Sequence, residues 1–345
     1  MIRGKSTSIE KHGARMEPEI EIKTKRRWKP KSFRALWGAI ALLLIAGVVV
    51  WYQRRPPAPV YSAKEVPSRA NRIAFSPERG AKYLAAAFSD GRVRIWETAT
   101  RRELTVKLPS QWPLNDLAWT GDGGTLFAGG FEQHVLAFNV QSSRAGKLPK
   151  FTAPVASVAV HPGKPEMIVS LANGELWWLN FQTEERAEIK SGHTGIVKVV
   201  RYHPDGNLFV TGGADKQLVW HDVKTQAVSK TVAAHEHEIS CLAFSADGTR
   251  IASGSWDNTV KVWQVDSANP LGTLPHPEGV VEVGWQGLDV ASSCWDGQLR
   301  VWNVSTTTII RDRACRSDAL AFAVWPGGEL IAEVDSAGTL HVDAP

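Results

Sequence analysis

Cysteine is scarce in this chain of 345 residues, which contains three cysteines: Cys241, Cys294 and Cys315. They form no CxxC pair and are too few and too scattered for a disulfide framework, so a disulfide-stabilised scaffold is excluded. We expect free thiols in or near the core. A bridge between Cys294 and Cys315 stays open, because the sequence does not reveal their distance.

A net positive charge is missing from residues 56–345, although the whole sequence has a net charge of +5 and a pI near 9.1. Residues 1–55 hold 13 of the 40 Lys and Arg residues but 4 of the 35 Asp and Glu residues. The remainder therefore carries 27 basic and 31 acidic side chains, a net charge of −4. A nucleic-acid-binding domain needs a basic surface, so this balance excludes nucleic acid as a partner.

One apolar run, residues 35–52 (ALWGAIALLLIAGVVVWY), contains no charge. As a helix it would be about 27 Å long, close to the hydrocarbon thickness of a bilayer. We expect a transmembrane helix that contacts the lipid bilayer; a buried core helix and a signal-peptide apolar region are the alternatives. Eight Lys and Arg residues lie within twenty residues before the run and five within twenty after it. The positive-inside rule therefore predicts a single-pass protein with a cytoplasmic N-terminus and the large domain on the non-cytoplasmic side.

The rest of the chain divides around this run. Residues 1–34 have little apolar content and read as a disordered basic arm, which could also rest on anionic lipid headgroups. Residues 53–59 form a short proline-rich linker, which is extended and stiff. Residues 60–345 are left as the folded domain.

An internal repeat explains why the chain has 15 Trp residues but 4 Tyr residues. Seven segments align on one marker position, with spacings of 42, 41, 42, 42, 39 and 41 residues: Trp96, Phe138, Leu179, His221, Trp263, Trp302 and Asp343. Six residues before each marker stand Asp90, Glu132, Asn173, Asp215, Asp257, Asp296 and Ala337. An Asp or Asn at that position is suited to a tight turn, because its side chain bonds the local backbone. The period predicts seven copies of one structural unit.

Each copy reads as four short strands. The first strand carries an apolar triplet, which begins in successive copies at Ile73, Leu117, Val158, Val200, Leu242, Val283 and Leu320. The fourth and sixth triplets place Arg201 and Gly284 at their centres. A lone four-stranded sheet cannot cover both of its faces, but sheets repeated radially bury one another. The sequence therefore predicts an all-β domain, a β-propeller with seven blades over residues 60–345.

The copies resemble the WD-repeat family in their period, marker Trp, turn Asp and the Gly-His pair of SGHTGIV at Ser191. The fifth copy, AHEHEISCLAFSADGTRIASGSWDNTVKVWQV, is close to that family's pattern throughout. The resemblance implies a closure in which a segment before the first copy supplies the outer strand of the last blade. Pro59–Val66 is the candidate segment, and the protein would be a membrane-anchored member of the family.

The resemblance also implies a structural hydrogen-bond network of His, Ser or Thr, Asp and Trp within a blade. In this sequence the network would join His235, Asp257 and Trp263; His276, Asp296 and Trp302; and His193 with Asp215. Ser253 or Ser255 would complete the first set, and a Ser-His-Asp hydrolase is the alternative interpretation. Repetition favours a structural role over three copies of one active site. We expect no catalytic residues, no metal site at His235 and His237, and no cofactor.

Large aromatic side chains occupy the position just before the turn residue in three copies, at Phe131, Trp256 and Trp295. Trp112 adds a fourth in the loop that leads into the second copy. Exposed aromatic residues dominate interface energetics, so these residues are candidate partner-binding anchors, with Arg313 and Arg316 as a polar rim. The alternative is that the rings pack over neighbouring blades or plug the channel mouth.

These features predict a membrane-tethered, non-enzymatic scaffold that binds a protein partner on the loop face of the propeller. A structural subunit of a multi-subunit membrane complex is the alternative. A ligand sensor or enzyme that uses the axial channel is a weaker one, because no convergent catalytic or cofactor-binding set is found. No small-molecule substrate is expected.

Overall fold

The computed structural model describes residues 68–343, except for residues 79, 105, 107, 109, 317–319, 326, 327, 329 and 336–338. The expected basic arm (1–34), apolar span (35–52), linker (53–59) and closing strand (Pro59–Val66) lie outside the described residues. Within the described part of the chain, no helix is long and apolar enough to cross a membrane.

The described residues fold into 27 strands, arranged as six four-stranded antiparallel sheets and one three-stranded sheet. Each sheet is one blade, and its strands follow one another in chain order. The first strands of the seven blades, nearest the central axis, are β1 (Ala70–Phe75), β5 (Leu114–Trp119), β9 (Val155–Val160), β13 (Val197–Tyr202), β17 (Ile239–Phe244), β21 (Val280–Gln286) and β25 (Phe322–Val324). The second strands are β2 (Tyr83–Phe88), β6 (Thr125–Gly130), β10 (Glu166–Leu171), β14 (Leu208–Gly213), β18 (Arg250–Ser255), β22 (Asp289–Cys294) and β26 (Ile331–Val334).

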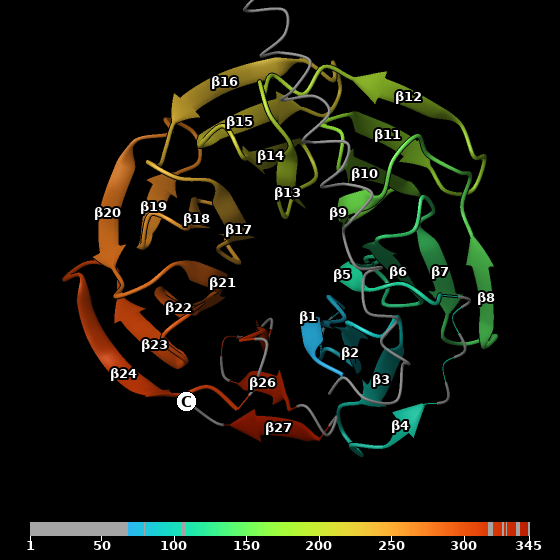
Figure 1. Cartoon of the computed structure of the whole chain (residues 1–345), viewed down its shortest axis with the longest axis horizontal. Helices are drawn as coiled ribbons and strands as arrows, with labels where there is room; N and C mark the ends of the chain where they lie inside the picture. The colour runs from blue at the N-terminus through green and yellow to red at the C-terminus, as the bar shows by residue number, and fades with distance from the viewer. Residues whose placement is uncertain are drawn as a thin grey trace, which may run out of the picture. The chain divides into compact units, whose positions relative to one another are not determined.

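The third strands contain the marker residues, and the fourth strands form the outer edge of the propeller (Figure 1). The third strands are β3 (Val93–Glu97), β7 (Leu136–Asn139), β11 (Leu176–Asn180), β15 (Gln217–Asp222), β19 (Thr259–Gln264), β23 (Gln298–Asn303) and β27 (Leu340–Asp343). The described fourth strands are β4 (Glu103–Leu104), β8 (Arg144–Lys147), β12 (Arg186–Ile189), β16 (Val228–Ala233), β20 (Pro270–Pro275) and β24 (Thr308–Ala314).

The blades close into a ring because each first strand contacts the first strand of the next blade, and β25 returns to β1 (Figure 1). In the described part of the chain, seven buried apolar clusters hold the ring together. Each cluster is built from two neighbouring blades, as where Ile95 of the first blade packs with Leu117 of the second. A single blade therefore lacks a core of its own, and the ring is the unit that buries apolar surface.

The marker residues occupy one equivalent position in the third strands, and their size is matched across the sheet. Trp96 pairs with Leu84, Trp263 with Ile251 and Trp302 with Val290. In the fourth blade the smaller His221 pairs with the larger Phe209, and the two rings stack with centroids 4.4 Å apart. A larger neighbour thus fills the volume that the missing Trp would have occupied.

The seventh blade begins two residues later than the sequence analysis expected. Its first strand is β25, so Phe322 and not Leu320 aligns with the first triplet residue of the other blades. Leu320 adopts a left-handed backbone conformation (φ 60°), which an extended strand does not accommodate. The hydroxyl group of Ser293 donates a 2.6 Å hydrogen bond to the Leu320 carbonyl and connects this residue to the sixth blade.

The cysteines are free thiols: Cys241 and Cys294 are buried, and Cys315 is half-buried. The bridge between Cys294 and Cys315 that the sequence left open is therefore not formed. Burial raises the pKa of both Cys241 and Cys315 to about 12, so these thiols stay protonated at neutral pH.

Candidate functional site

Four aromatic side chains are exposed on one face of the propeller, which we call the loop face because the inter-blade loops and the turns after the second strands lie there. Trp112 and Phe131 are 58% and 57% exposed, and Trp256 and Trp295 are 42% and 55% exposed. Antiparallel strands bring the end of each second strand beside the start of its first strand, which places all four residues on the same face. Trp256 also contacts neighbouring blades, because the Lys198 ammonium group of the fourth blade lies 5.2 Å from the centre of its ring.

Trp256 and Trp295 lie on either side of Gly279, the residue that precedes β21. A Cβ atom at Gly279 would lie 3.1 Å from Cδ1 of Trp295 and 3.4 Å from Cδ1 of Trp256. The glycine therefore allows two indoles from the fifth and sixth blades to approach the same loop. The His237 ring lies 6.0 Å from the Trp256 ring. We call Trp256, Trp295, Gly279 and His237 the tryptophan patch.

Trp112 and Phe131 belong to a separate hollow of about 550 Å³ at the second and third blades. Glu132 and Lys147 line it and form an ion pair of 2.8 Å, and Lys150 lies at its edge. The second blade is separated from the fifth by two blades, so the four aromatic residues form two groups on the loop face. Their shared position in the repeat did not predict this division.

Arg313 and Arg316, the expected polar rim, both bond Glu333 of the seventh blade. Arg313 lies in β24, and its guanidinium pairs at 2.6 Å with the buried carboxylate of Glu333 in the seventh blade. The backbone N–H of Arg316 donates to the same carboxylate. The Arg313 charge is thus matched within the fold, because a buried carboxylate requires a partner, and Arg313 is not an open rim residue.

The fifth blade contains a complete hydrogen-bond chain from the loop face into the core. The Nδ1 atom of His235 bonds Asp257 at 2.8 Å, and its Nε2 atom bonds the Ser253 hydroxyl at 2.7 Å. The Trp263 indole N–H donates to the same hydroxyl at 2.9 Å. Burial alone would raise the pKa of Asp257, but hydrogen bonds from His235, Thr259 and the Glu236 backbone outweigh it and hold the pKa below the ordinary range. The hydroxyl group is Ser253 and not Ser255, and the Trp263 hydrogen bond occupies it.

The fourth blade repeats this chain with a histidine in place of the Trp. His193 bonds Asp215 and Thr211, each at 2.8 Å, and Nε2 of His221 bonds the same Thr211 hydroxyl at 3.1 Å. His221 thus supplies the donor that an indole supplies elsewhere, while its Nδ1 atom is buried without a hydrogen-bond partner. Burial, with a smaller effect of His193, holds the pKa of His221 down to about 3.

In the sixth blade the expected contact between His276 and Asp296 is wrong. His276 bonds Ser292 at 2.8 Å, and the Trp302 indole donates to that hydroxyl at 3.1 Å. The Nδ1 atom of His276, however, bonds the Leu274 carbonyl at 3.0 Å. Asp296 pairs instead with Arg300, four residues later in β23. A charged guanidinium is a stronger partner for a carboxylate than a neutral imidazole ring.

Stability should therefore fall in mild acid. Burial holds the pKa of His276 to about 4 and of His221 to about 3, whereas both histidines titrate near 6.5 when unfolded. As pH falls below 6.5, the unfolded state binds protons that the folded state does not, so unfolding is favoured. Each histidine contributes a slope of about 1.4 kcal/mol per pH unit between pH 6.5 and its folded pKa.

The measurement is urea unfolding of wild type and His221→Gln from pH 7 to pH 4.5. Glutamine can still donate a hydrogen bond to Thr211 but does not titrate. The free energy of unfolding of the variant should therefore decrease less steeply with falling pH than that of wild type, by the contribution of one proton. Equal slopes for the two proteins would show that His221 already binds a proton in the folded state.

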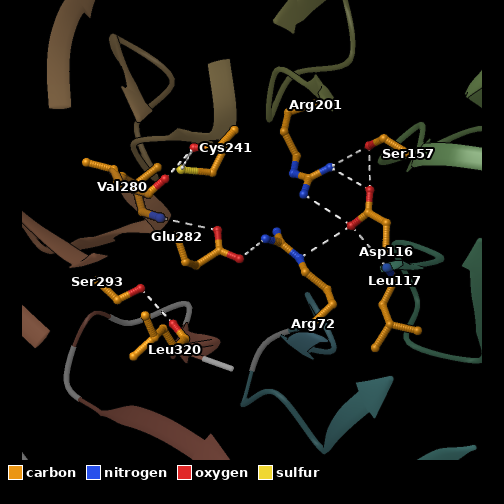
Figure 2. Close-up of polar contacts among 12 residues, drawn as sticks. Arg72, Asp116, Leu117, Ser157, Arg201, Cys241, Val280, Glu282, Ser293 and Leu320 are labelled. Atoms are coloured by element: carbon orange, nitrogen blue, oxygen red, sulfur yellow. Dashed lines mark hydrogen bonds and ion pairs between the residues drawn. The ribbon is translucent and has the colours of Figure 1, made fainter. Parts of the chain in front are cut away.

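The central channel is crossed by a charged network that the sequence analysis did not identify (Figure 2). Arg72 of β1 lies between Glu282 of β21 and Asp116 of β5, forms an ion pair with Glu282 and reaches Asp116 at 3.3 Å. Arg201 of β13 contacts the other side of Asp116 at 3.1 Å and the Ser157 hydroxyl at 3.3 Å. The network joins five of the seven blades and contains two positive and two negative groups.

Position in the strands explains this convergence. Arg72, Asp116, Ser157 and Glu282 each lie three residues before the last triplet residue of their first strand, and a register shift in the pairing lies beside each of them. Equivalent positions form one layer around the axis, so side chains far apart in sequence meet. Burial would raise the pKa of Asp116, but Arg201 and Arg72 outweigh it and lower that pKa.

A hollow of about 700 Å³ lies on the face opposite the loop face. Arg201 is among its lining residues and Asp116 is not, so the charged layer lies toward the loop face from the hollow. Its walls include small residues and rings from the ends of the first strands: Ala74, Phe75, Ala118, Trp119, Tyr202, Ala243, Phe244 and Trp285. Within the described part of the chain, no group of three His, Cys, Asp or Glu residues could hold a metal ion.

The sequence signal for the channel network was weak. The triplet VRY places Arg201 where other copies have Ala or Gly, and this departure was visible. Arg72, Asp116 and Glu282 precede their triplets and read as ordinary polar residues. In three copies a charged residue directly precedes the apolar triplet, and this shared position was the available signal for the network.

Comparison with known families agrees with this geometry. Residues 186–222, 227–264 and 268–303 match WD40, described as WD domain, G-beta repeat. The first of these segments begins in β12, the outer strand of the third blade, and ends in β15, so it spans parts of two blades. No curated protein matches the chain significantly. The chain is a seven-bladed β-propeller, and three of its segments match the WD40 repeat.

Proposed function

We propose that this chain is a membrane-tethered, non-enzymatic scaffold that binds a protein partner on the loop face of its propeller. The observation that supports it is the set of four exposed aromatic side chains on one face, Trp112, Phe131, Trp256 and Trp295. Exposed aromatic residues on a rigid surface are typical anchors of protein interfaces, since they bury large areas at low cost in side-chain entropy. The polar networks of the blades are structural in this proposal.

Residues 35–52 tether the scaffold as a single transmembrane helix, with the N-terminus in the cytoplasm and the propeller on the opposite side. The uncharged length of the run and the excess of basic residues before it support this topology. Its test is protease treatment of sealed vesicles. The propeller should be digested only from the non-cytoplasmic side, and digestion from the cytoplasmic side would reverse the proposed orientation.

The docking proposal is tested by affinity purification of the full-length protein from its native membrane in mild detergent. Trp256→Ala/Trp295→Ala is expected to lose a partner that wild type retains, because central aromatic anchors contribute about 2 kcal/mol or more each. The matched control is Leu288→Ala, which removes a side chain that is 68% exposed on the opposite face.

Loss with both variants would indicate general destabilisation, and retention with both would overturn docking at the tryptophan patch. A partner that is retained in fixed stoichiometry, and whose deletion removes this protein from the cell, would favour a permanent subunit of a membrane complex.

A further inference from the structure

The tryptophan patch lies among carboxylates. Glu278 directly precedes Gly279, the residue between the two indoles, and it is exposed. Glu236 is also exposed, and its backbone N–H bonds Asp257, which directly follows Trp256. Neither Glu236 nor Glu278 forms an ion pair with the described residues. Two exposed carboxylates, without an ion pair among the described residues, are therefore adjacent in sequence to His237 and Gly279 of the tryptophan patch.

The cations near this patch are already held by other carboxylates. Lys198 pairs with Glu238 at 3.2 Å, Arg300 with Asp296, and Arg313 with Glu333 at 2.6 Å. Arg316 is exposed in the loop that leads into the seventh blade, and its backbone N–H bonds Glu333. The loop segments nearest the indoles, which precede β17 and β21, therefore present more acidic than basic charge.

The protein itself shows how the patch binds a cation. The ammonium group of Lys198 lies over the Trp256 ring, 5.2 Å from its centroid, while Glu238 holds the same ammonium. An indole face and a carboxylate together thus bind one positive side chain. Trp295 also has an exposed ring, which lies next to Gly279, and Glu278 directly precedes that glycine. No described cation lies over the Trp295 ring.

We propose that the tryptophan patch binds a basic segment of the protein partner, with an arginine or lysine side chain placed over Trp295 and beside Glu278. This inference rests on the proposed function and specifies the chemistry of the docked segment. An indole attracts a cation through its negative π face, and a neighbouring carboxylate adds a charge-assisted hydrogen bond. Arginine should be preferred over lysine, because its planar guanidinium stacks on the ring and bonds the carboxylate with two N–H groups.

The test is fluorescence anisotropy of a labelled octa-arginine peptide titrated with the full-length protein in mild detergent. Trp256→Ala/Trp295→Ala should weaken binding about tenfold, since the cation–π contact with Trp295 and the aromatic surface of Trp256 beside it are both removed. Glu278→Gln should weaken it about threefold, and the loss should shrink at high salt. The matched control is Glu184→Gln, which removes an exposed carboxylate on the opposite face and should leave binding unchanged. An octa-lysine peptide of equal charge should bind more weakly.

Equal weakening by Glu278→Gln and Glu184→Gln would overturn the proposal, because it would show attraction to net charge alone. Unchanged binding in the double Trp variant would overturn it as well. If deletion of residues 1–34 creates Trp-dependent binding that wild type lacks, the basic arm of this chain is the occupant instead of a partner, and the proposed orientation across the membrane is wrong as well. If the native partner is lost with the Trp variant but not with Glu278→Gln, docking at the patch stands and its cationic chemistry does not.

Discussion

Replacement of Arg72 by methionine is expected to lower the free energy of unfolding by about 3–5 kcal/mol. Arg72 pairs with both Glu282 and Asp116 in the centre of the ring, and the two carboxylates are 7% and 5% exposed. Methionine has a similar length but no charge, so Glu282 would remain buried without a cation. The measurement is urea unfolding of the full-length chain, followed by tryptophan fluorescence.

Two controls separate this effect from general damage. Arg92→Met removes an ion pair with Asp90 from a side chain that is 67% exposed, and it should cost less than about 1 kcal/mol. Arg72→Met/Glu282→Leu removes the pair together and should be more stable than Arg72→Met alone, because no unpaired charge is left. If Arg72→Met is as stable as wild type, water or a local rearrangement stabilises the Glu282 carboxylate in place of the lost guanidinium.

Replacement of Ser253 by alanine is expected to destabilise the fifth blade by about 2–4 kcal/mol. The Ser253 hydroxyl bonds Nε2 of His235 at 2.7 Å and accepts the Trp263 indole N–H at 2.9 Å. Without it, two buried polar groups lose their partners, while the removed oxygen leaves little space for water. The change is measured by the same unfolding transition.

Ser253→Thr is the matched variant, because Thr211 occupies the equivalent position in the fourth blade and makes the equivalent bonds. It should be more stable than Ser253→Ala because it keeps the hydroxyl group, although the added methyl group at this buried site costs about 1 kcal/mol or more. If Ser253→Ala and Ser253→Thr unfold at the same urea concentration, the hydroxyl group does not stabilise the blade. The hydrogen-bond chain from Asp257 to Trp263 would then contribute nothing to stability.

The number of blades and most strand positions could be predicted because they depend on local pattern. A marker residue, a turn residue and an alternating strand recur about every 41 residues, and each reflects contacts within one copy or with its neighbour. The seventh blade departs from the expectation where the pattern is weakest. LAF at Leu320 resembles the other triplets, but the left-handed backbone at Leu320 moves the strand to Phe322.

The hydrogen-bond networks of the blades show that residue type and position do not always predict which side chains bond one another. The position of His276 predicted a bond to Asp296, but Arg300 lies within the same hairpin and takes that carboxylate. His221 was visible as a missing Trp, yet its stacking on Phe209 and its bond to Thr211 depend on the neighbouring strand. Arg313 was expected at an open rim. The sequence does not show its buried partner, Glu333, because that carboxylate comes from another blade.

Sequence alone thus established the repeat, the propeller and the aromatic positions of the loop face, since these follow from spacing and from strand alternation. Only the closed ring decided which side chains meet across its axis. Arg72 and Glu282 are separated by 210 positions in the chain and contact one another because the sixth, seventh and first blades are adjacent. Within the sixth blade, the pairing of β21 with β22 places Gly279 next to the Trp295 ring, and the charge of the preceding residue, Glu278, selects a basic partner in our proposal.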